Sequence, residues 1–154
     1  MRIKNNKIDI IIEMLCILLL VGISGYILFM WSSIPEKIPM HYDALGNIDR
    51  WGDKAEIIIL PITSWLMYLF MTGIGFVPTL WNTGVKVTQE NQERVYRTLK
   101  YLMKTMKLIV VLDFSILTLY SLLGKSLPSW FTIVILIAVF GNLLFWIVRL
   151  FKVK

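Results

Sequence analysis

Four apolar stretches, each long enough to cross a bilayer, constrain this chain of 154 residues more than any other feature. A transmembrane helix needs about 20 mostly apolar residues, because the hydrocarbon core is roughly 30 Å thick. Apolar residues make up 57% of the chain, whereas soluble domains contain roughly 45–50%. The sequence therefore predicts an all-α polytopic membrane protein, with a single domain over residues 1–154. The predicted transmembrane helices cover residues 8–31, 55–81, 104–124 and 129–150.

Lys and Arg residues are divided unequally between the segments that flank these helices. Twelve of the 16 lie in the N-terminal tail, the segment 82–103 with the helix start that follows it, and the C-terminal tail. Because Lys and Arg accumulate on the cytoplasmic side, we predict cytoplasmic termini and a cytoplasmic segment 82–103. The loop 32–54 is then ordered and extracytoplasmic. This topology accounts for the formal charge of +6, so we predict membrane lipid as a partner and no direct nucleic-acid binding.

The extracytoplasmic loop carries the only histidine of the chain, His41, close to Asp43, Asp49 and Asp53. Carboxylates and an imidazole are the ligands that hard cations and zinc use. The spacing matches no metal motif, however, so His41, Asp43 and Asp49 are only weak metal candidates and we predict no cofactor. In the alternative interpretation these acids cap turns and form ion pairs, and the loop is a rigid lid on the helices.

In the lid interpretation, Trp51 is the apolar anchor and the acids pair with Arg50 and Lys54. Pro35 and Pro39 favour extended or turn backbone between the helices. A rigid polar surface at the outer face of the membrane could bind a ligand. The predicted ligand-binding residues are His41, Asp43, Asp49, Arg50, Trp51 and Lys54.

Three polar residues lie at similar depths in three predicted helices: Glu13, Asp113 and Asn142. Each is six or seven residues from a basic residue at the cytoplasmic end, which corresponds to roughly 9–10 Å of helix. Ionisable residues in a bilayer are costly and often functional, so the three could form one intramembrane polar cluster. Alternatively, Glu13 reaches the interface or pairs with Lys104 or Lys107, and Asn142 bonds to a neighbouring helix.

The sequence lacks the usual catalytic motifs. It contains no HExxH pair, no glycine-rich phosphate loop and no G-x-S-x-G. The single Cys16 lies inside an apolar stretch and cannot form a disulfide within the chain. We therefore predict no catalytic residues and favour a protein that is not an enzyme.

The loop contains the pattern I-P-x-H-(4)-G-x-x-D-R-W-G-x-K, built from Pro39, His41, Gly46, Asp49, Arg50, Trp51, Gly52 and Lys54. This pattern between two membrane helices resembles the N-terminal domain of unknown function in SdpI-like bacterial membrane proteins. The resemblance covers about residues 8–80. It implies a multi-pass protein of the bacterial cytoplasmic membrane. Some members confer immunity to a secreted toxin peptide, and some sequester a cytoplasmic regulator.

The leading hypothesis is therefore toxin-peptide immunity or sensing through the extracytoplasmic loop, with a cytoplasmic regulator as a further partner. One alternative is a transport or enzyme-accessory subunit that uses the intramembrane polar residues. A second alternative is a metal-dependent membrane enzyme. Small residues on the helices, including Gly22, Gly25, Gly73 and Gly141, also fit a homodimer.

Overall fold

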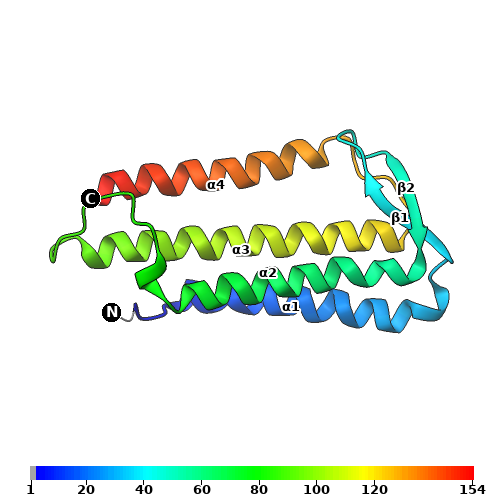
Figure 1. The fold of residues 1–154 in the computed structure, drawn as a ribbon, viewed down its shortest axis with the longest axis horizontal. Helices are drawn as coiled ribbons and strands as arrows, with labels where there is room; N and C mark the ends of the chain where they lie inside the picture. Colours follow the sequence, from blue (N-terminus) through cyan, green and yellow to red (C-terminus); the bar gives the residue numbers. More distant parts are fainter. Residues whose placement is uncertain (1–2) are drawn as a thin grey trace.

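The computed structural model describes residues 3–154, which form four α-helices and one β-hairpin (Figure 1). Three helical segments are long and apolar enough to cross a membrane: Lys7–Ser33, Lys54–Gly75 and Phe131–Val153. The protein is thus mostly helical, with three candidate membrane-spanning helices. The elements are α1 (Lys7–Met30), β1 (Lys37–Tyr42), β2 (Ile48–Asp53), α2 (Ile59–Gly75), α3 (Gln92–Leu122) and α4 (Phe131–Val153).

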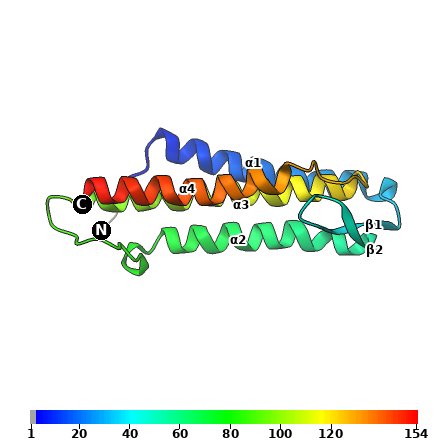
Figure 2. The same cartoon turned by 90° about the horizontal axis from the view of Figure 1, so that it is seen from above.

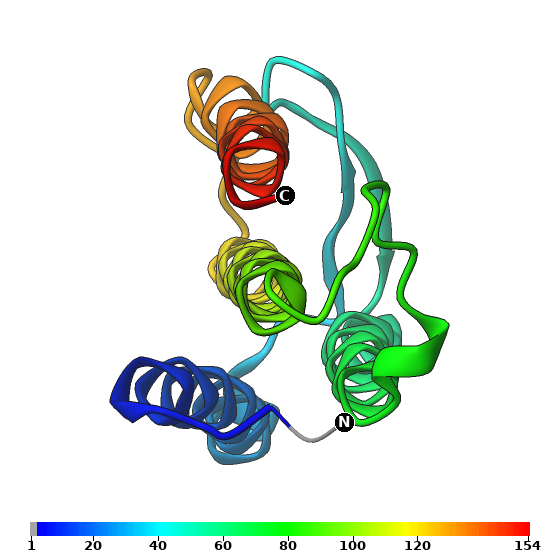
Figure 3. The same cartoon turned by 90° about the vertical axis from the view of Figure 1, so that its left-hand side faces the viewer.

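Helix α3 is the centre of the fold and packs against each of the other three helices (Figure 3). Helix α4 packs mainly on α3, so most of its apolar surface is uncovered within the chain. Helices α1 and α2 also contact each other, so α1, α2 and α3 form one group and α4 lies apart from α1 and α2 (Figure 2 and Figure 3). Such exposed apolar surface would be costly in water and is typical of helices that face lipid.

The segments that connect the helices lie at the two ends of the molecule (Figure 1). The termini and the connection between α2 and α3 lie at one end, which we call the tail end. The hairpin and the link from α3 to α4 lie at the other, the hairpin end. The segments that carry most of the Lys and Arg residues therefore lie at the tail end. The two segments with few of them lie at the hairpin end.

The helix boundaries differ from the prediction mainly around the segment between α2 and α3. Helix α2 ends at Gly75 rather than at residue 81, and a short 3-10 turn, η3 (Pro78–Leu80), follows. Helix α3 begins at Gln92, after a turn that Thr88 and Asn91 close. The backbone N–H of Thr88 donates to the Asn91 side chain (2.8 Å), and Asn91 N–H donates to the Thr88 hydroxyl (3.3 Å). Helix α3 is thus one continuous helix from the polar segment into the apolar stretch, and it begins 12 residues before the predicted start at residue 104.

The loop that the sequence predicted as ordered contains an antiparallel hairpin, in which β1 pairs with β2. Its base is held by a buried cluster of Ile27, Ile34, Ile38 and Ile57. Trp51, predicted as the apolar anchor, has 53% of its surface exposed, so that prediction is wrong. Isoleucines at the strand and helix ends anchor the hairpin because the apolar face of β1, not β2, turns toward the helices.

Two glycines shape the hairpin end. Gly46 lies at the hairpin tip with φ +85°, and its carbonyl accepts a hydrogen bond from Leu127 N–H (2.9 Å). The link from α3 to α4 is therefore docked onto the hairpin. Gly124 (φ +63°) ends α3, with Lys125 N–H donating to the Tyr120 carbonyl (3.1 Å), a helix stop that favours glycine.

Candidate functional site

The exposed charges of the hairpin pair with one another, but not with the predicted partners. His41 Nδ1 lies 2.6 Å from Asp49 Oδ1, and Lys37 Nζ lies 2.5 Å from Asp53 Oδ1. Arg50 pairs with Glu56 rather than with an aspartate (3.3 Å). The first two pairs join the two antiparallel strands, whereas Glu56 lies in the 3-10 turn η2 (Lys54–Ile58) that follows β2.

Lys54 lies over the ring of Trp31, 5.0 Å from its centroid, and is therefore not the carboxylate partner that the sequence suggested. This cation–π contact joins the end of the hairpin to the 3-10 turn η1 (Trp31–Ser33) after α1. It orients the hairpin over the ends of α1 and α2.

Asp43 organises the tip of the hairpin. Its carboxylate accepts hydrogen bonds from the Asn47 side chain (3.0 Å) and from the backbone N–H groups of Asn47 (2.9 Å) and Leu45 (2.8 Å). These donors lower the pKa of Asp43 below the ordinary value of an aspartate, the side chain of Asn47 contributing most. Asp43 thus caps a turn, as the lid interpretation expected.

His41, Asp43 and Asp49 do not converge on one point, since His41 pairs with Asp49 and Asp43 bonds to its own turn. Within residues 3–154 there is no group of three His, Cys, Asp or Glu side chains that could hold a metal ion. The weak metal assignment from the sequence therefore finds no geometric support.

Glu13 is the centre of an ion-pair network at the tail end, which joins α1, α2 and α3. Its carboxylate accepts from Lys107 (2.8 Å), Lys104 (3.2 Å) and the Tyr68 hydroxyl (2.7 Å). Lys107, which is 4% exposed, also donates to the Thr72 hydroxyl (2.9 Å). The alternative in which Glu13 pairs with the two lysines is thus confirmed.

A second buried pair, which the sequence analysis missed, lies next to this network. Asp9 is 1% exposed and accepts a hydrogen bond from Lys100 Nζ at 2.9 Å. Asp9 also completes a capping box with Asn6 at the start of α1. The signal in the sequence was the spacing: Asp9 and Glu13 are four residues apart on α1, and Lys100, Lys104 and Lys107 share one face of α3.

The predicted cluster of Glu13, Asp113 and Asn142 is wrong, because the three side chains have different surroundings. Asn142 accepts a hydrogen bond from the Thr105 hydroxyl (2.7 Å), which joins α4 to α3. Asp113 faces neither of the others and lines a cavity below the hairpin. The three also differ in depth, because Glu13 and Asn142 bond to side chains within residues 104–107 of α3, whereas Asp113 lies six residues beyond Lys107.

The cavity below the hairpin has a volume of about 390 Å³. Its roof is β1, with His41 and Asp43 at the rim, and its walls are α3 and α4. The Tyr42 hydroxyl lies 3.4 Å from the Ser121 hydroxyl in its upper part. The other lining residues are mainly apolar: Met40, Leu60, Leu117, Leu127, Phe131, Thr132, Ile135 and Leu136.

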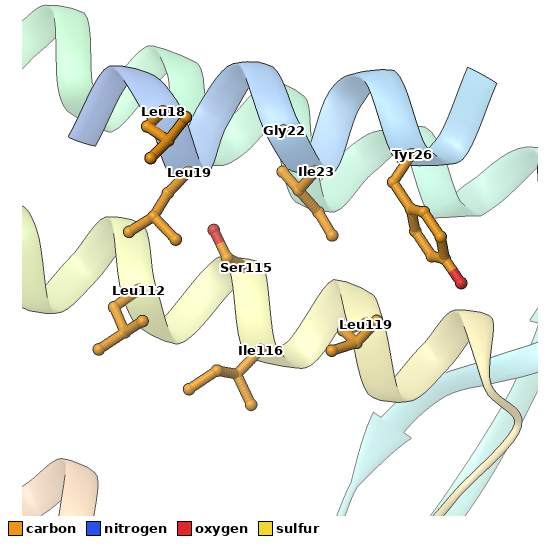
Figure 4. A pocket seen from close by; sticks show the side chains of 9 residues that line it. All are labelled: Leu18, Leu19, Gly22, Ile23, Tyr26, Leu112, Ser115, Ile116 and Leu119. Carbon is orange, nitrogen blue, oxygen red and sulfur yellow. The ribbon is translucent and has the colours of Figure 1, made fainter. Parts of the chain in front are cut away.

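A second hollow, about 330 Å³, lies between α1 and α3 (Figure 4). Leu19, Ile23 and Tyr26 of α1 face Ser115 and Leu119 of α3 across it. The hydroxyl of Ser115 is already bonded to the Val111 carbonyl of its own helix (2.7 Å). This hollow offers an apolar surface without an unpaired charge, which suits a lipid chain better than a polar ligand.

Comparison with known proteins places the hairpin in a recurrent domain. Residues 17–64 match the family described as "Domain of unknown function (DUF1648)", a domain found in SdpI-like membrane proteins. An uncharacterized protein of Archaeoglobus fulgidus is 44% identical over 36 residues, which cover 23% of this chain and 20% of that relative. No solved structure matches the chain. The similarity thus covers the second half of α1, the hairpin and the start of α2, and the resemblance drawn from the loop motif is confirmed for this domain.

Proposed function

We propose that the chain is a multi-pass protein of the bacterial cytoplasmic membrane, of the SdpI-like type, that binds a secreted peptide at its outer face. Binding would serve immunity to the peptide or sensing of it. In this topology α1 to α4 all cross the bilayer, the tail end is cytoplasmic and the hairpin end is outside. The distribution of basic residues supports this orientation.

The observation that carries the proposal is the combination of an acidic hairpin with an apolar cavity directly below it. The segment from Ile34 to Glu56 contains five acidic residues and three Lys or Arg residues. A cationic amphipathic peptide matches both parts, because its charges would meet the rim while its apolar side chains enter the cavity. The hairpin is held by buried isoleucines and by the link at Leu127, so the rim is preorganised.

The transmembrane character of α3 rests on its second half. Helix α3 has 31 residues and is therefore about 46 Å long, which exceeds the thickness of the hydrocarbon core. Its charged first half would extend into the cytoplasm, where it could contact a cytoplasmic regulator. Lys107 does not need to reach the interface, because Glu13 neutralises it within the protein.

Protection of a peptide-sensitive host tests the proposed function. We expect His41→Ala, at the rim of the cavity, to reduce protection against the peptide. Lys37→Ala is the matched control, since Lys37 is also an exposed hairpin side chain with one carboxylate partner but does not line the cavity. Full protection by the His41 variant at equal membrane abundance would contradict the proposal.

A further inference from the structure

The Asp113 carboxyl has no partner within the part of the chain that the structure describes. No hydrogen bond or ion pair from residues 3–154 reaches it, although the residue is partly buried between α3 and α4. In the proposed topology it lies six residues, or about 9 Å, beyond Lys107 toward the hairpin end. A carboxylate at such a depth is costly unless a cation or a hydrogen-bond donor neutralises it.

The nearby cations of the chain are already occupied. Lys100 pairs with Asp9, and Lys104 and Lys107 both pair with Glu13. The next lysine along α3 is Lys125, beyond the end of the helix and exposed. Any cation that neutralises Asp113 therefore comes from outside the described chain.

The cavity around Asp113 restricts what that cation can be. Asp113, Leu117 and Ser121 follow one another at intervals of four residues, so the cavity follows one face of α3 for about 12 Å. Its other wall consists of apolar side chains of α4, including Ile135 and Leu136. A hydrated metal ion would find one carboxylate and mainly hydrocarbon there. An ammonium group on an apolar chain matches both features.

We propose that this cavity binds a primary ammonium group carried on an apolar chain, with the Asp113 carboxylate as its counter-ion. The site deepens the function proposed above and rests on it for the source of the amine, which is a lysine side chain or the N-terminus of the secreted peptide. The ammonium group donates to Asp113, and the attached chain packs against Leu117 and the apolar wall of α4. His41 and Asp43 lie at the outer entrance.

Octylamine is a suitable probe, because a primary amine is protonated at neutral pH and octanol offers an uncharged chain of the same length. The full-length protein is placed in phosphatidylcholine nanodiscs and titrated calorimetrically, with empty nanodiscs subtracted. We expect saturable binding of octylamine and none of octanol. Asp113→Asn should weaken octylamine binding by roughly tenfold or more, because it removes a charge-assisted hydrogen bond.

Two variants control for the charge and the fold. Asp113→Glu keeps the carboxylate and should bind octylamine, and so should Glu93→Gln, which removes an exposed acid at the tail end. If Asp113→Asn fails to fold, Leu136→Trp keeps the carboxylate but fills the cavity, and it should abolish binding. Leu136 is 50% exposed, so the larger side chain does not strain a packed core.

Equal binding of octylamine by the native chain and by Asp113→Asn would overturn the site, and so would equal binding of octanol. Displacement of octylamine by phosphatidylethanolamine would assign the site to a lipid and would also contradict the proposal. Failure of the proposed function is distinguishable. If octylamine binding requires Asp113 while His41→Ala still protects the host, the result supports the amine site and contradicts the immunity function.

Discussion

The ion-pair network around Glu13 makes a quantitative prediction about stability. Glu13→Leu removes the acceptor of Tyr68, Lys104 and Lys107 in one step. Lys104 keeps the Asp9 backbone carbonyl at 2.9 Å, but Lys107 keeps only uncharged partners, the Thr72 hydroxyl and the face of the Tyr68 ring. One buried lysine is thus left without a counter-ion, and such a loss costs about 3–5 kcal/mol. We expect the lower end of this range, because 26% of the Glu13 side chain is exposed.

The double variant Glu13→Leu with Lys107→Met separates the ion pair from its surroundings. With both charges gone, the main remaining loss is the hydrogen bond of the Tyr68 hydroxyl, about 1 kcal/mol. The double variant should therefore be more stable than Glu13→Leu alone by about 2 kcal/mol, the difference between these two costs.

The assay is the free energy of unfolding of the purified protein, measured by titrating dodecyl sulfate into mixed micelles and following helix content by circular dichroism. Glu93→Gln is the matched control, since Glu93 forms an exposed pair with Arg97 (3.1 Å) and should contribute no more than about 0.5 kcal/mol. The reasoning is refuted if the effects of Glu13→Leu and Lys107→Met add within about 0.5 kcal/mol, because independent sites behave in this way.

Two further predictions concern the hairpin end and use the same unfolding assay. Gly46→Ala should destabilise the protein by more than Gly84→Ala. Both positions have positive φ, but a Cβ at Gly46 would lie 2.5 Å from the Leu127 carbonyl oxygen, whereas one at Gly84 meets nothing within 4 Å. Equal effects would show that the link is not docked on the hairpin. Ile57→Ala should cost about 2–5 kcal/mol because Ile57 is fully buried, and Trp51→Ala should change stability by less than about 0.5 kcal/mol. A larger loss of stability for Trp51→Ala would show that Trp51 does anchor the hairpin.

The pattern of apolar stretches was sufficient to predict a mostly helical chain, in which three helices are long and apolar enough to cross a membrane. Such properties are local: a helix satisfies its own backbone hydrogen bonds, so length and hydropathy alone predict which segments form membrane helices. The same holds for the Asp43 turn, whose hydrogen-bond partners lie within four residues. The pairing of Glu13 with lysines was foreseen as an alternative because both lie at similar depth.

The tertiary structure decided which side chains meet. Sequence spacing specifies the depth of a residue only relative to the end of its own helix, and it leaves the neighbours around the axis open. Glu13 lies level with Lys104 and Lys107 in an ion-pair network, whereas Asp113 lies six residues beyond Lys107 in a cavity. The hairpin register likewise pairs His41 with Arg50, and a register shift beside this pair brings Asp49 to the His41 ring while Trp51 stays exposed. Cross-strand neighbours of this kind depend on which residues turn the chain.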